Sequence, residues 1–464
     1  MKGQSSIGFM GGKWVANKLL NELKSSERIS VLLPTHFLKK IVVYAYIVSS
    51  NIIEERKDLR KEGEIYFEVK YSKKVKIPEC PYKCKGCKDK REYIVRNGKA
   101  KERIIKAGKV GTQRIYLIHR PQRYMCKKTG KTFRDEKISY RWQRITRAET
   151  ENIVKGLRKM SISATAKEFG VSVRTVSNLL DSIEVKVDWT KFQDMEDIKL
   201  GIDEHSFRGF KMVTTIVELN TSNTIAILKS DKKEELKGFL NKIPYEIKQK
   251  ITEVAIDMRA SFKNAVKEEL PGVKVVADHF HVVKDAQKKL RESIKIEEEV
   301  TNNNKKIPVK LFFLNGKKLL KEKKKVKKLY KTLKEHPYLK EYYRYLLMLK
   351  WMYKAETYEE GKRRLHILIE KMEESEDPQV WRWAKTYIRW EKEILQYFVN
   401  RTTTAKVEGR HTHIKLIKRI SFGFKEVLRY TKKVLLGVMP ERFIKLPNFI
   451  TEGTTYCKQL SFLS

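Results

Sequence analysis

Residues 199–219 read KLGIDEHSFRGFKMVTTIVEL, and this stretch decides the expected fold of the central part of the chain. The apolar residues 200–202 lead directly into two acids, Asp203 and Glu204, and a second β-rich run follows at residues 212–217. Short apolar runs bounded by turn signals are typical of buried strands. We therefore predict a buried strand that ends in carboxylates, an arrangement that needs a chemical reason.

The bulk composition predicts several domains and a polyanionic partner. A chain of 464 residues exceeds one ordinary core, and 41% hydrophobic residues suffice to build real cores. The 101 Lys and Arg outnumber the 57 Asp and Glu, so the formal net charge is +44. Such a surface repels itself unless nucleic acid or an anionic membrane neutralises it. Because no apolar run of about 18 residues and no secretory signal occur, we expect a cytoplasmic, nucleic-acid-binding protein with no membrane partner. Lys-rich codon usage is the alternative source of the charge.

Four cysteines predict a small zinc-ribbon-like β module at residues 75–140. Hairpin signals at Asn97-Gly98 and Gly108 separate the knuckle CPYKCKGC from the last cysteine of the set. Zn²⁺ takes four ligands in a tetrahedron, but Thr129 stands where a second knuckle would have its second cysteine, and His119 is a substitute candidate. The alternative is a basic β module without metal. The candidate zinc ligands are Cys80, Cys84, Cys87 and Cys126.

A helix-turn-helix is predicted at residues 161–183. The first helix has apolar spacing, Gly170 marks a turn, and a serine caps a second helix whose apolar residues include Val173. The second helix of such a motif enters the DNA major groove, where short polar side chains and arginine suit base edges and phosphates. The alternative is a helical hairpin packed inside the protein. The candidate DNA-binding residues are Ser172, Arg174, Thr175, Ser177 and Asn178.

Two further strands are predicted to end in acids. Residues 254–256 lead into Asp257, and the run GVKVVADHFHVVKDA places Asp278 after another β run. With a third β run at residues 224–228, this order is an α/β layout with acids at strand ends. Adjacent strands would bring Asp203 and Asp257 within a few ångströms, where two carboxylates repel each other unless a divalent cation joins them. Two Mg²⁺ ions about 4 Å apart are the usual means of activating water at a phosphodiester.

A pair of ions needs a third carboxylate, and Glu408 is the best candidate. It lies in NRTTTAKVEGRHTHIKLIKRISFGF, after a polar, cap-like run and before a basic helix. On spacing alone, a solvated glutamate on a basic helix is an equal alternative.

Four motifs together resemble a known family. GIDEHSFRGF, AIDMRASFKNAV, ADHFHVVK and TTTAKVEGRHTHIKLIKRISFGF, in this order behind a cysteine knuckle and a helix-turn-helix, look like the bacterial insertion-sequence transposases of the ISL-three (ISL3) family over roughly residues 75–435. The resemblance implies an RNase H-like core whose DDE triad, Asp203, Asp257 and Glu408, holds Mg²⁺ or Mn²⁺. By the same resemblance, Glu204 is a sequence neighbour of Asp203 and not a member of the triad.

The same resemblance implies a function and supporting residues. A transposase of this kind binds terminal inverted repeats in double-stranded DNA, cuts and joins strands, and pairs two ends as a homo-oligomer. Asp278 and His281 match a D-x-x-H signature that would support the site, although a satisfied core histidine is an equal interpretation of His281. The Thr403-Thr404-Ala405 segment replaces the Asn-Gly that is common in the family. The alternative function is therefore a decayed or domesticated transposase that only binds DNA.

These features predict a multidomain α+β chain with seven segments. The large helical insertion is expected to hold its four tryptophans mainly as core, and its lysine-rich face would also track DNA phosphates. The segments are an N-terminal part of unclear role (1–74), the zinc-ribbon-like module (75–140), the helix-turn-helix (141–190), the first part of the RNase H-like core (191–283), the helical insertion (284–400), the last part of the core with the Glu408 helix (401–438) and a tail (439–464).

Overall fold

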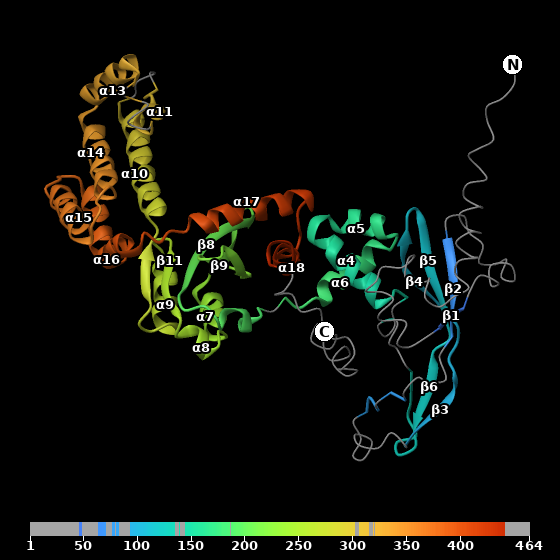
Figure 1. The fold of residues 1–464 in the computed structure, drawn as a ribbon. Helices are drawn as coiled ribbons and strands as arrows, with labels where there is room; N and C mark the ends of the chain where they lie inside the picture. Colours follow the sequence, from blue (N-terminus) through green and yellow to red (C-terminus); the bar gives the residue numbers. More distant parts are fainter. Residues whose placement is uncertain are drawn as a thin grey trace, which may run out of the picture. The chain divides into compact units, whose positions relative to one another are not determined.

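The chain divides into two compact units, Met1–Ile183 with Leu446–Ser464, and Glu184–Lys445. Figure 1 shows the elements of both units in a computed structural model, and each unit is described here by itself. The structure describes residues 46–48, 64–70, 77–78, 80–82, 93–134, 139, 144–185, 187–301, 306–314, 319 and 321–440. The expected N-terminal segment and C-terminal tail lie mostly outside these ranges.

The first unit contains two small sheets. One has the strand order β1-β2-β5-β4, in which β2 and β5 run parallel. The other is antiparallel, with the order β3-β6-β7. The strands are β1 Tyr46–Val48, β2 Glu64–Lys70, β3 Ile94–Lys99, β4 Arg103–Val110, β5 Gln113–His119, β6 Gln122–Cys126 and β7 Thr132–Arg134.

Two turns expected in this region are wrong, because Asn97-Gly98 and Gly108 lie inside strands. The pairing of β3 with β6 and that of β4 with β5 both shift register at these glycines. Their φ angles are +64° and +147°, so each glycine accommodates an irregularity in its strand rather than a reversal of the chain. The chain reverses instead at Gly111, between β4 and β5.

Three consecutive helices complete the described part of the first unit: α4 Arg147–Lys159, α5 Ile162–Phe169 and α6 Val173–Ser182. Ser161 and Ser172 cap α5 and α6 by accepting backbone N–H groups, and Gly170 (φ +56°) closes α5 in the left-handed conformation. The predicted helices and their turn are confirmed. Val173, one of the apolar residues of the predicted second helix, starts α6 and is 50% exposed.

The second unit is built on a mixed five-stranded sheet with the order β10-β9-β8-β11-β12. Strands β8, β9 and β10 form an antiparallel meander, whereas β11 and β12 run parallel to β8. All five occur where apolar runs predict strands. They are β8 Ile198–Arg208, β9 Lys211–Glu218, β10 Asn223–Ile227, β11 Ile251–Ile256 and β12 Lys274–Ala277.

The expected end of the first strand needs a correction. Asp203 lies in the middle of β8, which continues to Arg208 because it keeps pairing with β9 as far as Lys211. The parallel pairing with β11, however, ends at the pair Ile202–Ile256. Asp203 is therefore at the edge of the parallel part of the sheet while its own strand goes on.

Helices cover both faces of this sheet. Ile202, Val254 and Ile256 face the helices α7 and α9 in one large core. Val217 and Ala255 face the opposite way and pack with Val407 of α17. The helices around the sheet are α7 Lys233–Asn241, α8 Tyr245–Lys248, α9 Ala260–Glu269, α17 Ala405–Ile420 and α18 Val427–Val438, and a short 3₁₀ helix, Trp189–Phe192, precedes β8.

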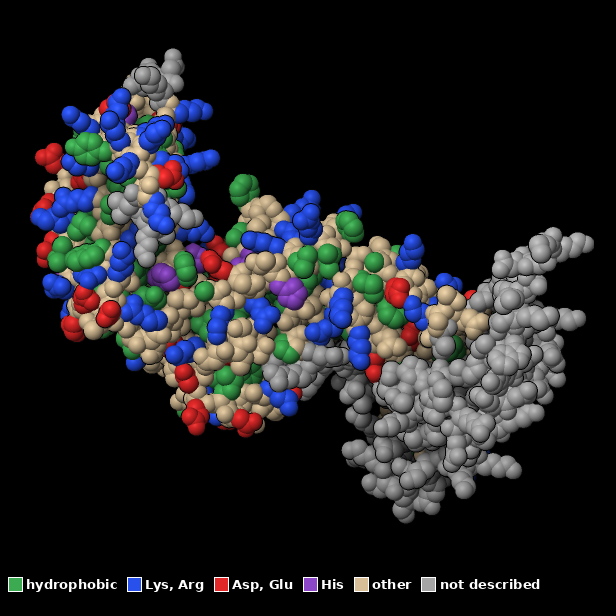
Figure 2. Space-filling view, turned by 45° about the horizontal axis from the view of Figure 1, so that its top comes forward, with side chains coloured by type: hydrophobic (Ala, Val, Ile, Leu, Met, Phe, Trp, Pro, Cys, Tyr) green, Lys and Arg blue, Asp and Glu red, His purple; other side chains and the backbone are tan. Residues whose placement is uncertain are grey.

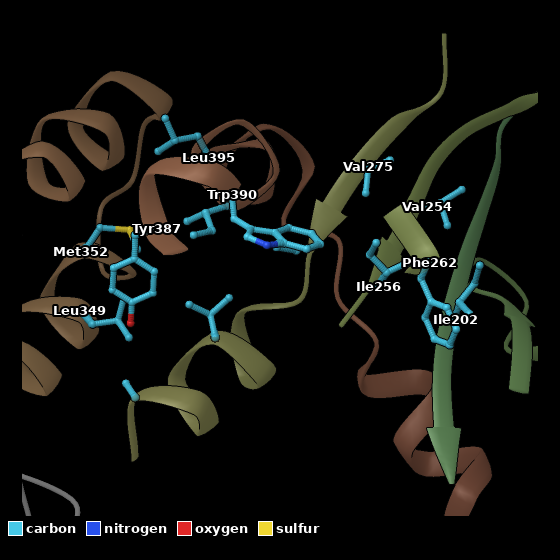
Figure 3. Packing of buried hydrophobic residues seen from close by; sticks show 14 of the residues in the cluster. Ile202, Val254, Ile256, Phe262, Val275, Leu349, Met352, Tyr387, Trp390 and Leu395 are labelled. Atoms are coloured by element: carbon cyan, nitrogen blue, oxygen red, sulfur yellow. The ribbon is translucent and has the colours of Figure 1, made fainter. Parts of the chain in front are cut away.

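A helical region lies in the chain between β12 and α17. Figure 3 shows its side chains, including Tyr387 and Trp390, continuing the core that begins at the sheet. Burial of the tryptophans is confirmed for Trp383 and Trp390, whereas Trp351 and Trp381 are 39% and 46% exposed. No described helix is long and apolar enough to cross a membrane. The helices are α10 His279–Val300, α11 Val309–Phe312, α13 Lys323–Glu335, α14 Pro337–Met352, α15 Tyr358–Glu373 and α16 Pro378–Asn400.

Candidate active site

Three aspartates form a row across three neighbouring strands. Ile202 pairs with Ile256, and Ile256 pairs with Ala277, in parallel register. The next residue of each strand is an aspartate, and the Asp278 N–H donates to the Ile256 carbonyl at 2.9 Å. Neighbouring strands are about 4.8 Å apart, so the row is compact. Its members are Asp203, Asp257 and Asp278.

Side-chain alternation assigns the row to one face of the sheet. Residues two apart on a strand share a face, so Asp257 follows Ala255 and Asp278 follows Val276. Ala255 and Val276 both pack with Val407 of α17. The three aspartates therefore belong to the face that α17 covers.

Glu408 is in the first turn of α17, and three contacts hold that helix on the sheet. The Thr404 N–H donates to Asp278 Oδ1 at 3.1 Å. Val407 packs on Gly201, where an added Cβ would come within 2.6 Å of the valine Cγ2. His411 Nδ1 is 3.5 Å from Asp203 Oδ2. The residues on both sides of Glu408 thus contact β8 or the aspartate row.

The acids act on one another electrostatically. Burial raises the pKa of Asp203 to about 6; His281 opposes this rise, and the charges of Asp257 and Glu408 add to it. An isolated carboxylate in water would titrate near 4. The side chains of these widely separated acids therefore share one electrostatic environment.

The donors fit a hard divalent cation by their chemistry. Carboxylate oxygens are the ligands that Mg²⁺ and Mn²⁺ prefer, and like charges gathered on one face favour a cation between them. In the described part of the chain, no three His, Cys, Asp or Glu side chains lie close enough together to hold a metal ion. The carboxylates of Asp203, Asp257 and Glu408 would have to approach one another to form such a site.

His281 lies between two aspartates of the row. Its Nε2 is 3.8 Å from Asp203 Oδ1 and its Nδ1 is 3.3 Å from Asp278 Oδ2. Burial lowers the pKa of His281, but the close contact with Asp278 and the charge of Asp203 outweigh burial and raise the pKa to about 8. Asp278 is fully buried, and its contacts with His281 and Thr404 outweigh burial and lower its pKa.

A buried chain of hydrogen-bonding groups behind Asp203 was not predicted. His411 Nε2 is 3.1 Å from Thr215 Oγ1, which is 3.0 Å from His205 Nδ1, and His205 Nε2 is 2.7 Å from the Tyr430 hydroxyl. Burial is the first cause that lowers the pKa of His205 to about 3 and that of His411 to about 4, so both rings are neutral near pH 7.

One direction of hydrogen bonding satisfies the whole chain. An ionised Asp203 can only accept, so the N–H of neutral His411 faces it and His411 Nε2 accepts from the Thr215 hydroxyl. Thr215 then accepts from His205, which accepts from Tyr430. The sequence held a signal for this chain, because His205 is two residues from Asp203 on a strand and His411 is three residues from Glu408 on a helix.

Glu204 is engaged elsewhere. Strand alternation directs it to the face opposite Asp203, where it forms an ion pair with Arg259. Arg259 also donates to Asp231 Oδ2 at 3.0 Å. The second acid of the opening motif therefore has a partner of its own outside the aspartate row.

The candidate DNA-binding residues begin α6 in the first unit. Ser172 and Thr175 bond to each other, with their hydroxyl oxygens 2.8 Å apart. Ser172, Arg174 and Asn178 are exposed, whereas Thr175 and Ser177 are half-buried. Three of the five side chains are therefore exposed at the surface of α6 and its cap.

The cysteine site is described only in part. Cys80 and Cys126 are buried in the same cluster with Ile94 and Tyr124. Cys84 and Cys87 lie outside the described residues. His119, the candidate substitute ligand, ends β5 in the other sheet of the unit.

Comparison with known proteins identifies the family. Residues 200–434 match the profile of the DDE transposase family ISL3, described as a transposase. The chain is also 24% identical over 191 residues to the transposase for insertion sequence element IS1001 of Bordetella parapertussis. That match covers 39% of this chain and 45% of the relative, so it spans less than half of the relative's length. Because the family profile covers half of the chain, this protein belongs to the ISL3 family of transposases.

Proposed function

We propose that this protein is the DNA transposase of an insertion sequence, with Asp203, Asp257 and Glu408 as its catalytic carboxylates. The observation that carries the proposal is the aspartate row in matched register, covered by the helix that bears Glu408. The sheet order β10-β9-β8-β11-β12, with its antiparallel meander and two parallel strands, supports an RNase H-like core. The protein would act on double-stranded DNA in the cytoplasm.

The three carboxylates would hold Mg²⁺ or Mn²⁺. A divalent ion bound there supplies Lewis-acid chemistry that activates water or a 3′ hydroxyl and stabilises the leaving oxygen of a phosphodiester. Asp203 is held from behind by His411, and Asp278 anchors the start of the Glu408 helix through Thr404. In this proposal, His281 bridges Asp203 and Asp278 and keeps the row ordered.

The first unit would bind the ends of the element. Helices α5 and α6 with the Gly170 turn support a helix-turn-helix that presents Arg174 and Asn178 to the major groove. Cys80 and Cys126 share a buried cluster, which supports zinc binding together with Cys84 and Cys87. Because transposition pairs two ends, the active form would be a homo-oligomer.

The test is metal-dependent cleavage of duplexes made from the DNA that flanks the gene on either side. We expect wild-type protein to nick these duplexes with Mg²⁺ or Mn²⁺, and Asp203→Asn, Asp257→Asn and Glu408→Gln each to lose cleavage while retaining binding. Glu234→Gln, at an exposed position on α7, is the matched control. Equal cleavage by wild type and Asp203→Asn would remove Asp203 from the site. Specific binding without cleavage by wild type would favour the alternative function, a decayed transposase that acts as a DNA-binding protein.

A further inference from the structure

Two phenylalanines of the second unit are almost completely exposed. Phe210 is 103% and Phe422 is 91% exposed, more than any other large hydrophobic side chain in the described part of the chain. Burying such a side chain would stabilise the fold through the hydrophobic effect. Neither phenylalanine contributes in this way, so their presence needs another reason.

The backbone at both positions holds the phenylalanines at exposed turns. Phe422 adopts the left-handed conformation with φ +55°, directly before Gly423 at φ +88°. A bulky side chain strains the backbone in that region, whereas glycine adopts it freely. Phe210 projects from a two-residue turn between Arg208 and Lys211, after Gly209 at φ +56°. The protein thus presents one aromatic ring on a tight hairpin and the other on a strained helix end.

The two rings are at the ends of elements that lie together. Lys418 Nζ, on α17, donates to the Ser206 carbonyl of β8 at 3.2 Å. Phe207 of β8 packs with Ile414 and Ile417 of α17 in one cluster. The hairpin tip and the α17–α18 turn are therefore neighbours on one side of the second unit.

Both elements also carry candidate catalytic acids. From Asp203 to Arg208 the strand rises roughly 17 Å, and from Glu408 to Ile420 the helix rises roughly 18 Å. One base pair of duplex DNA is about 3.4 Å long. A duplex that runs along these elements from the acids would meet the two rings about five base pairs away.

Charge around the rings favours a polyanion. No acid occurs in residues 205–217 or 409–425. Figure 2 shows Lys and Arg outnumbering Asp and Glu among the charged side chains on the face in view. A second protein copy would bring the same cations against these, whereas DNA phosphates would neutralise them. The basic side chains nearest the rings in the sequence are Arg208, Lys211, Lys415, Lys418, Arg419 and Lys425.

We propose that Phe210 and Phe422 form an aromatic pair that inserts into double-stranded DNA and stacks on bases about five base pairs from the cleaved phosphate. Apolar side chains that enter the base stack unstack a step and bend the duplex, and each aromatic–base contact contributes through stacking. The distorted duplex would then bend toward the acids. This inference deepens the proposed function and rests on it for the identity of the substrate.

The test uses full-length protein and duplexes of flanking DNA with 2-aminopurine at successive positions. Calcium replaces Mg²⁺ so that binding is measured without cleavage. We expect wild type and Asp203→Asn to raise the fluorescence at one position near the fifth base pair, and Phe210→Ala and Phe422→Ala to abolish the increase. Tyr245→Ala, which removes a 72% exposed aromatic ring on α8, is the matched control and should behave as wild type.

Phe422→Gly separates this role from a structural one. Because glycine suits the left-handed backbone, the variant should be at least as stable as wild type toward urea, yet cut the duplex about tenfold more slowly. A duplex with a mismatch at the fluorescent position should restore its rate, since the mismatch removes the cost of unstacking.

The outcomes distinguish this inference from the proposed function. Cleavage by wild type with no effect of the phenylalanine variants overturns the inference alone. Fluorescence that depends on both phenylalanines, without cleavage by wild type, supports the inference and overturns the catalytic proposal. Variants that change the oligomeric state without DNA and leave the fluorescence intact would assign the rings to a contact between copies, which also overturns the inference.

Discussion

Gly201 lies directly beneath Val407, and a Cβ at residue 201 would come within 2.6 Å of the valine Cγ2. The same Cβ would come within 2.7 Å of Leu219 Cδ2, so two side chains leave no room for a side chain at residue 201. The missing side chain lets α17 approach β8. Because Glu408 follows Val407, the distance between the strand of Asp203 and the helix of Glu408 depends on this glycine.

Gly201→Ala should therefore lower both stability and cleavage. We expect a loss of about 1–3 kcal/mol in the free energy of unfolding, which is usual for overpacking. Cleavage should fall further than stability explains, because α17 must move away from β8. Urea unfolding and cleavage assays measure the two effects. Gly238→Ala is the control, since nothing lies within 4 Å of its Cβ position on α7 and alanine should slightly stabilise that helix. Full activity of Gly201→Ala would show that α17 tolerates the shift.

Thr215→Val should uncouple the two buried histidines. Valine keeps the shape but loses the hydroxyl that contacts both His205 and His411, and unsatisfied buried groups cost about 1–3 kcal/mol. We expect lower stability and a lower kcat with unchanged DNA affinity, because Asp203 loses its oriented partner. The control is Thr214→Val, on the opposite face, where the hydroxyl donates only to the Ser230 carbonyl. Equal effects of both variants on kcat would assign Thr215 a purely structural role.

Arg174→Ala should weaken recognition of the element ends. Arg174 is exposed near the start of α6, where a helix-turn-helix contacts bases. Loss of a base contact weakens the free energy of specific binding by about 1–3 kcal/mol. The ratio of the affinity for the element ends to the affinity for unrelated DNA should therefore decrease. Binding to flanking and to scrambled duplexes, measured at two salt concentrations, separates this loss from a phosphate contact. An equal decrease on both duplexes would assign Arg174 to the phosphate backbone.

His119 should make the first unit sensitive to acid. Burial, and next the charge of Arg103, lower the pKa of this histidine to about 4 in the folded state, below the usual 6.5. As pH falls from 6.5, the unfolded chain takes up the proton first, so the contribution of His119 is complete above pH 6.5 and is lost as pH falls toward 4. At pH 5 the loss should be about 2 kcal/mol. His119→Gln should show a smaller drop in stability between pH 7 and pH 5; an unchanged drop would exclude His119 as the cause.

Local patterns in the chain were enough to predict the elements and their chemistry. Short apolar runs predicted the five strands of the second unit, and the glycine and serine signals predicted the helices α5 and α6, because backbone propensity and side-chain periodicity act over neighbouring residues. The family resemblance, now supported by the profile match over residues 200–434, depended on ordered motifs in the same way. The prediction of turns at Gly98 and Gly108 was wrong, because a glycine with positive φ occurs in a strand bulge as well as in a chain reversal.

Only the tertiary structure decided which of these residues meet. Asp203 lies in the middle of β8 because β8 continues to pair with β9 beyond it. The residues around Asp203 do not indicate how far this pairing extends. The approach of Val407 to Gly201 joins residues about two hundred positions apart, as does the contact of His411 with Asp203. Such contacts depend on sheet order, register and helix packing. The sequence therefore showed which residue types the site contains. The tertiary structure decided that the three aspartates lie on one face of the sheet, beneath α17.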